Sequence, residues 1–281
     1  MKKNIAFFTC IILCGISQLQ LSAQNIYNMG SFIKGAKSYT FGDNCRIRKA
    51  PSLSAETVDT LSIAMPVTII SKNDKQETIS GQTQNWFEIS YAKNKKGYIW
   101  GGLIAYAYTK DGDYLLLIGI TSYSDHSFRG EARLVKNNKL VSKVDFKPHS
   151  TDMNKYYGYD ISVKNSSNRG LTSINSLYMI VAGYPACGYT NGTTLLGRSG
   201  SELLYLLQTN EVSEAGLFRS SESLIFPSNK DGNKNEIIVH SIMQEYDEKK
   251  DDLVTQEEKK SHYKISGKKT TLISEEKIKG I

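Results

Sequence analysis

The residues of this chain that could perform covalent or metal chemistry are its four cysteines and four histidines. A cysteine nucleophile needs an exposed thiolate, commonly at a helix N-terminus, and a histidine that activates it. Cys187 lies instead in a Gly-Tyr-Pro-Ala-Cys-Gly-Tyr segment, which is typical of a loop. No pair of histidines has the spacing of metal ligands. The sequence therefore predicts no catalytic cysteine, no metal and no cofactor; the isolated histidines are His126, His149, His240 and His262.

Serine and phosphate chemistry are not indicated either. Ser199 follows Gly197-Arg198 and precedes Gly200, which is not the Gly-x-Ser-x-Gly spacing of a nucleophile elbow. The chain contains no glycine-rich phosphate-binding loop. We predict that the protein is not an enzyme. An unrecognised envelope hydrolase that uses the C-terminal half of the chain is the alternative.

Aromatic side chains offer a different chemistry, which is recognition by contact. Exposed aromatic residues give a large contact area at a small entropic cost, and this suits peptide or glycan ligands. Tyr39, Tyr91 and Trp100 are the residues that we expect to contact a ligand. Trp86 and Tyr98 are expected to pack mainly in a core.

The elements that must position these aromatics are short strands. Residues 67–70 and 86–91 alternate apolar and polar side chains with period two, as half-buried strands do. The polar residues 71–84 between them predict a hairpin or loop, and residues 94–97 predict a turn.

Two flanking motifs complete this block, Cys45-Arg-Ile-Arg-Lys-Ala-Pro-Ser52 at its start and Gly97-Tyr-Ile-Trp100 at its end. Together with the strands, they resemble a bacterial SH3 (SH3b) domain over residues 38–106. The resemblance implies a small β-barrel that binds and does not catalyse. The chain departs from the family at Ala64-Met65-Pro66, where a glycine is usual, so that this turn is expected to use proline geometry.

Residues 107–281 predict a second β-rich domain, sandwich-like or open, that belongs to no named family. Asn137-Asn138 sits between two apolar runs and can take positive φ, as a tight hairpin requires. Residues 245–261 are charged and predict a solvated loop or a long exposed hairpin arm, with a short helix as the alternative. The Asp-Gly pairs at 111–112 and 231–232 are similar to the calcium loops of FG-GAP and VCBS-type propellers, but polar turns before strands are the favoured interpretation.

The first 23 residues predict an export signal, with Lys2 and Lys3 before an apolar run and small residues at Ser22-Ala23. Lipid attachment at Cys14 is the alternative. Residues 24–37 form a polar lead-in. The expected location is periplasmic or extracellular, and no transmembrane segment is predicted, because the apolar run is shorter than the about 20 residues that span a bilayer as a helix.

Loss of the two signal lysines leaves 35 − 2 = 33 basic residues against 28 acidic ones, a net charge of +5. This mild excess suits anionic envelope polymers and gives no sign of nucleic-acid binding. Two cysteines remain in the exported chain, Cys45 and Cys187. They could form a disulfide between the two domains, or Cys45 could be a small buried hydrophobe of the first strand.

These features predict a non-catalytic binding protein of the bacterial cell envelope, whose SH3b module recognises a peptidoglycan peptide or an envelope protein. The alternative is a structural or assembly protein whose SH3b module docks on its own C-terminal domain.

Overall fold

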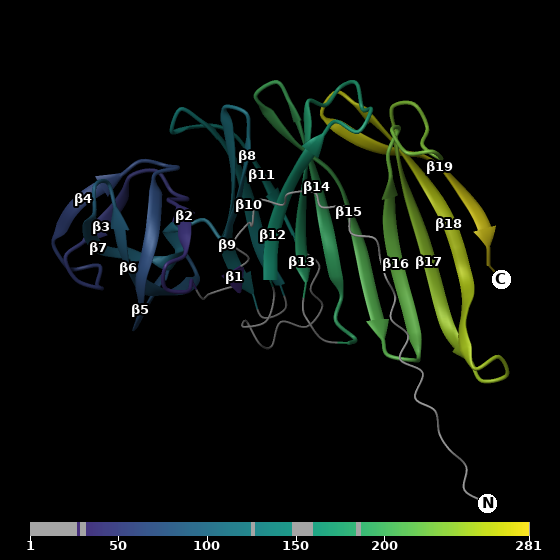
Figure 1. Ribbon diagram of the computed structural model, residues 1–281, viewed down its shortest axis with the longest axis horizontal. Helices are drawn as coiled ribbons and strands as arrows, with labels where there is room; N and C mark the ends of the chain where they lie inside the picture. The colour runs from purple at the N-terminus through teal and green to yellow at the C-terminus, as the bar shows by residue number, and fades with distance from the viewer. Residues whose placement is uncertain (1–26, 29–31, 125–126, 148–159, 184–186, 281) are drawn as a thin grey trace, which may run out of the picture.

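The computed structural model describes residues 27–28, 32–124, 127–147, 160–183 and 187–280, and these are mostly β-strand (Figure 1). The turn of 3-10 helix η1 (Gly101–Leu103) is the only helical element in these ranges. The strands form three antiparallel sheets of six, four and nine strands. The prediction of an all-β chain with two β-rich domains is confirmed.

The N-terminal barrel, which we define as residues 32–106, is the six-stranded sheet curled around one apolar cluster. Alternation along each strand builds this cluster; in β3, Cys45 and Ile47 are buried and Arg46 is exposed. Phe87 and Ile99 lie at its centre, wholly buried, and each such side chain contributes about 1.5–3 kcal/mol. In sheet order the strands are β2 (Lys37–Tyr39), β5 (Pro66–Ile79), β6 (Gln82–Tyr91), β7 (Lys95–Trp100), β3 (Cys45–Arg48) and β4 (Thr57–Leu61).

The C-terminal domain begins with a β-sandwich. One face of the four-stranded sheet packs on the first strands of the nine-stranded sheet, around Ile118, Leu134, Tyr178 and Leu196. The four-stranded sheet contains β11 (Lys139–Phe146), β10 (Ser127–Lys136), β9 (Tyr114–Ser124) and β8 (Ala107–Asp111). The nine-stranded sheet contains β1 (Tyr27–Asn28), β12 (Asp160–Ser167), β13 (Ser176–Gly183), β14 (Asn191–Ser199), β15 (Glu202–Glu214), β16 (Phe218–Ile225), β17 (Glu236–Asp247), β18 (Asp252–Ser266) and β19 (Lys269–Lys279).

The far part of the nine-stranded sheet curls beyond the sandwich, as the green and yellow strands of Figure 1 show. Ile237, Val239 and Ile265 from β17 and β18 share an apolar cluster with Leu195 of β14. At one end the curl brings β19 back to β15, where the Lys268 ammonium lies 2.7 Å from a Glu202 carboxylate oxygen. The charged segment 245–261 forms the ends of β17 and β18 and the turn between them, which confirms the predicted long hairpin.

Turn chemistry was predictable from sequence at several points. Asn137 and Asn138 adopt φ of 50° and 54° between β10 and β11, as the predicted hairpin requires. Both Asp-Gly pairs lie at connections that lead into the next strand: Asp111 ends β8 and Gly112 begins the turn before β9, and Asp231-Gly232 lies in the loop before β17. The Asp111 carboxylate of the first pair accepts hydrogen bonds from Arg198 and from the Tyr178 hydroxyl, both at 2.7 Å, and so ties the β8–β9 turn to the opposite sheet.

The barrel is docked on the outer face of the four-stranded sheet. This domain contact contains the buried side chains of Phe41, Ile63, Ala64, Ala105, Leu117 and Val135. The Tyr39 and Tyr108 rings meet edge to face at 4.8 Å beside it. The four-stranded sheet is therefore covered on both faces, by the barrel on one side and by the nine-stranded sheet on the other.

An ionic cluster around one buried carboxylate reinforces the domain contact. The Glu131 carboxylate, 5% exposed, accepts hydrogen bonds from Arg133 at 2.5 Å and Lys143 at 2.7 Å. Arg133 also donates to the Phe41 carbonyl at 2.6 Å and lies 4.0 Å over the centre of the Phe41 ring. A guanidinium on the sandwich thus binds both the backbone and the ring of one barrel residue.

Two expectations about the barrel are wrong. Ala64 adopts a left-handed φ of 64°, so the turn uses the conformation that glycine favours and does not rely on proline geometry. Its methyl group is buried in the domain contact, which holds it in this strained state. Cys45 and Cys187 are free thiols, the first buried in the barrel cluster and the second exposed on the other domain, so they do not form the interdomain disulfide.

The export signal, the lipidation alternative at Cys14 and residues 24–26 and 29–31 of the polar lead-in lie outside the described residues. Two lead-in residues, Tyr27 and Asn28, pair with Ile161 and Asp160 at the edge of the nine-stranded sheet. Phe32 and Ala36, which precede the expected start of the module at residue 38, already belong to the barrel cluster.

Candidate binding site

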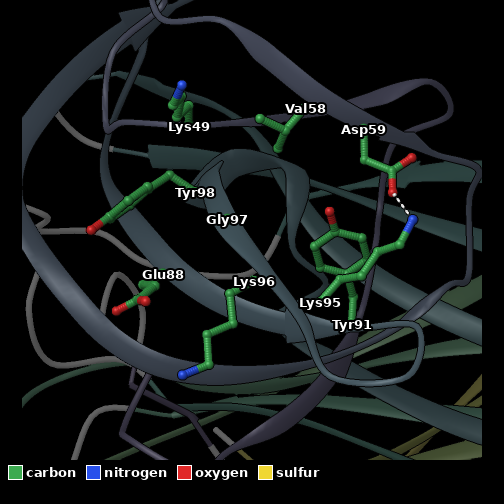
Figure 2. A pocket seen from close by; sticks show the side chains of 9 residues that line it. All are labelled: Lys49, Val58, Asp59, Glu88, Tyr91, Lys95, Lys96, Gly97 and Tyr98. Carbon is green, nitrogen blue, oxygen red and sulfur yellow. Dashed lines mark hydrogen bonds and ion pairs between the residues drawn. The ribbon is translucent and has the colours of Figure 1, made fainter.

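An open pocket of about 440 Å³ lies on the N-terminal barrel, between the β3–β4 and β6–β7 pairs (Figure 2). Gly97 lines the pocket and packs tightly on the barrel core, because a Cβ atom there would lie only 2.4 Å from Cγ2 of the buried Ile47. None of the lining residues belongs to the apolar cluster of the domain contact, so the pocket remains accessible in the docked protein. The lining residues are Lys49, Val58, Asp59, Glu88, Tyr91, Lys95, Lys96, Gly97 and Tyr98.

One wall of the pocket consists of Tyr98 with charged neighbours. The register of β6 and β7 places Glu88 directly opposite Tyr98, and Ser90 opposite Lys96. Directly opposed residues share a face of a sheet, and successive residues alternate. Lys96, Tyr98 and Glu88 therefore all lie on the outer face of the barrel, while Ile99 points into the core.

The other wall is fixed by an ion pair. The Lys95 ammonium lies 3.0 Å from the Asp59 carboxylate, as the dashed line in Figure 2 marks. This hydrogen bond from Lys95 is the main cause that lowers the pKa of Asp59. The Tyr91 hydroxyl is a further partner of Asp59, and burial raises the pKa of Tyr91. The charges of Lys95 and Asp59 thus neutralise each other.

Three charged side chains of the pocket are not neutralised in this way. Lys96 is exposed and makes no ion pair within the described ranges. Lys49 lies 3.3 Å from Glu56, but both side chains are about 70% exposed, with values of 72% and 69%, so the pair is weak. Glu88 accepts a hydrogen bond from the Ser71 hydroxyl at 3.2 Å and makes no ion pair within the described ranges. The pocket therefore offers free charges of both signs beside an aromatic ring.

The turn that carries the pocket lysines is strained. Ala92, Lys93 and Asn94 adopt φ of 25°, 56° and 67°, and only asparagine among these tolerates the left-handed region well. Strained non-glycine residues cost of order 1–3 kcal/mol each and concentrate at functional sites. The strain favours the interpretation that this turn is shaped for the position of Lys95 and Lys96.

The structure separates the aromatic residues that we expected to bind a ligand. Tyr91 reaches the pocket but is only 5% exposed, and Trp100 is also only 5% exposed, with its indole donating to the Glu77 carbonyl at 3.0 Å. Tyr39 is half-buried and packs on Tyr108 beside the domain contact. The expectation of exposed contacts is therefore wrong for Tyr91 and Trp100, because both are covered by their own barrel.

Trp86 is buried as expected, whereas Tyr98 is only half-buried and lines the pocket. The signal that could have identified Tyr98 is the alternation in β7, where Lys96 and Tyr98 share a face and Gly97 and Ile99 share the other.

The groups considered for catalysis are placed apart from one another. His240 pairs with Glu258 at 2.8 Å and His262 with Glu236 at 3.0 Å, on strands β17 and β18. Cys187 is exposed in the loop before β14. Within the described ranges, no three His, Cys, Asp or Glu side chains gather as metal ligands would. His126 and His149 lie outside these ranges.

No helix among the described residues is long and apolar enough to span a membrane. Searches of protein-family models, of curated proteins and of solved structures found no match to this chain. The fold and the pocket place the chain in a broad class: all-β proteins of two domains, here with an open, charged pocket on the N-terminal barrel.

Proposed function

We propose that the protein is an exported, non-catalytic binding protein of the bacterial cell envelope, and that its N-terminal barrel is an SH3b module. The pocket binds the peptide part of peptidoglycan or an extended segment of an envelope protein. The observation that carries this proposal is the pocket itself, which places Tyr98, Lys96 and Glu88 together on a face that the domain contact leaves open.

The chemistry of the pocket fits a peptide. A half-buried tyrosine ring provides apolar contact, and its charged neighbours can pair with the charges of a ligand. The pocket is also open, so that it can accept a point along a long polymer and does not require a free small molecule.

The test is retention of the purified mature chain, residues 24–281, on insoluble cell-wall sacculi. The complete chain is used because the isolated barrel would expose the apolar surface around Phe41 and Ile63. We expect the wild-type chain to sediment with sacculi, and Tyr98→Ala to reduce the retained fraction at least fivefold. Lys75→Ala, which changes an exposed lysine outside the pocket, is the matched control. The proposal would be contradicted if sacculi retained the wild type, Tyr98→Ala and Lys75→Ala equally, or retained none of the three.

The domain contact favours a second candidate function, a structural one in which the barrel is a fixed part of an assembly scaffold. The contact buries six apolar side chains and the Arg133 hydrogen bond to the barrel backbone. In this case the mature chain unfolds as one unit, and neither sacculi nor envelope protein extracts retain it through the pocket. The Tyr98→Ala comparison separates the two candidates, because only the binding function depends on that side chain.

A further inference from the structure

We propose that the pocket selects a peptide segment that carries both a carboxylate and an ammonium group, with an excess of carboxylate. Lys96, assisted by Lys49, binds the carboxylate, Glu88 binds the ammonium group, and the atoms between these two groups lie on Tyr98. This inference rests on the proposed function and names the chemistry of the ligand for the same pocket.

The charges of the pocket carry the first step. The lining residues contain three lysines and two carboxylates, a net charge of 3 − 2 = +1. The pair Lys95–Asp59 at 3.0 Å is internally satisfied. This leaves the ammonium group of Lys96, that of Lys49, whose exposed pair with Glu56 at 3.3 Å is weak, and the carboxylate of Glu88. A ligand of complementary charge has two negative groups and one positive group.

The register of the strands carries the second step. Lys96 of β7 lies opposite Ser90 of β6, and Glu88 lies two residues before Ser90 on β6. Lys96 and Glu88 are therefore diagonal neighbours. Diagonal neighbours in an antiparallel pair have Cα atoms about 7–8 Å apart. Residues i and i+2 of an extended peptide face the same side and are about 6.6 Å apart. Opposite charges two residues apart in an extended ligand therefore match the two free charges.

The rigidity of the pocket carries the third step. Gly97 lets β7 lie against Ile47, and the Lys95–Asp59 pair with Tyr91 fixes the neighbouring wall. A fixed strand backbone sets the positions from which the Glu88 and Lys96 side chains extend, and a ligand that leaves either charge unpaired loses a charge-assisted hydrogen bond.

The test uses one synthetic peptide, N-acetyl-L-Glu-L-Ala-L-Lys with a free C-terminal carboxylate, which carries two carboxylates and one ammonium group and has its Glu and Lys side chains two residues apart. Two blocked forms are compared with it, one with its carboxylates amidated and one with its amino group acetylated. Binding to the mature chain is measured by isothermal titration calorimetry at low salt. We expect each blocked form to bind at least tenfold more weakly than the free peptide. We expect Lys96→Ala to weaken the free peptide about tenfold and to leave the amidated form unchanged.

Glu88→Gln supplies the complementary arm, since it keeps the shape and hydrogen-bonding capacity of the side chain. It is expected to weaken the free peptide about tenfold and to leave the acetylated form unchanged. Lys75→Ala is again the control, and circular dichroism checks that each variant is folded.

The outcomes separate this inference from the proposed function. Equal affinity for free and blocked peptides overturns the inference but leaves the proposed function intact. Retention on sacculi without binding of any of the three peptides also overturns the inference and leaves the proposed function intact. Failure to bind both sacculi and peptides overturns both.

Discussion

Removal of the Arg133 side chain is expected to uncouple the two domains. In Arg133→Ala, Glu131 keeps only Lys143 as a partner, the Phe41 carbonyl loses its hydrogen bond at 2.6 Å, and the contact over the Phe41 ring at 4.0 Å disappears. Removal of one partner of a buried ion pair typically costs about 3–5 kcal/mol. Because Lys143 still pairs with Glu131, we expect a loss near the lower limit, about 3 kcal/mol.

The composition of the chain makes this loss measurable domain by domain. Its two tryptophans, Trp86 and Trp100, both belong to the barrel. Tryptophan fluorescence during urea unfolding therefore reports the barrel alone, while far-ultraviolet circular dichroism reports all strands. In the wild-type chain we expect both probes to give one midpoint. In Arg133→Ala the fluorescence midpoint should fall below the dichroism midpoint.

A double-mutant cycle with Glu131→Gln isolates the ion pair from general loss of packing. The two substitutions should together cost clearly less than the sum of their separate effects, because Arg133→Ala leaves a buried carboxylate that Glu131→Gln removes. Coincident midpoints in Arg133→Ala, with a loss below about 0.5 kcal/mol, which is what an ordinary surface substitution costs, would refute the interpretation of Arg133 as the residue that couples the domains.

Three further predictions follow from the same contacts. Burial disfavours the charged form of Glu131, but hydrogen bonds from Lys143 and Arg133 outweigh it and hold its pKa below the ordinary 4.5. Its contribution to stability is therefore complete above that value and is lost as the pH falls through the folded pKa. Urea midpoints measured from pH 7 to pH 3 should fall less steeply in Glu131→Gln than in the wild type. Burial raises the pKa of the Cys45 thiol to about 12, so the native mature chain should react with Ellman's reagent at one thiol, Cys187, and the unfolded chain at two; two fast thiols in the native chain would contradict the burial. Gly97→Ala places a methyl group 2.4 Å from Ile47 and should cost about 1–3 kcal/mol, whereas Ser90→Ala, on the outer face of the adjacent strand, should change the midpoint little.

The local structure of this chain is largely predictable because it depends on neighbouring residues. Strand alternation identified β5 and β6, and Asn137-Asn138 identified a hairpin through its tolerance of positive φ. These signals need no knowledge of the tertiary structure, and the structure follows them.

The exposure of individual aromatics is not predictable in the same way. Alternation assigns Trp86, Tyr98 and Trp100 of the β6–β7 pair to one face of the sheet. It does not predict which of these side chains are covered by other segments of the chain. The indole of Trp100 is fixed by the Glu77 carbonyl of strand β5, and Tyr98 is left half-open at the pocket. Tyr39 is fixed by Tyr108, from a different sheet. The covering segments are distant along the chain, so the candidate site became visible only in three dimensions.

The sandwiched position of the four-stranded sheet has a consequence for the order in which the chain acquires its structure. Domains near the N-terminus generally fold first during synthesis. Here the barrel segment ends at residue 106, but its surface around Phe41 and Ile63 is covered by Leu117 and Val135, which are synthesised later. The newly made barrel thus exposes this apolar surface until residues 107–135 have been synthesised, an interval of 135 − 106 = 29 residues. During that interval the exposed surface around Phe41 and Ile63 is the part of the chain to which a chaperone would bind, or through which it would aggregate with another chain.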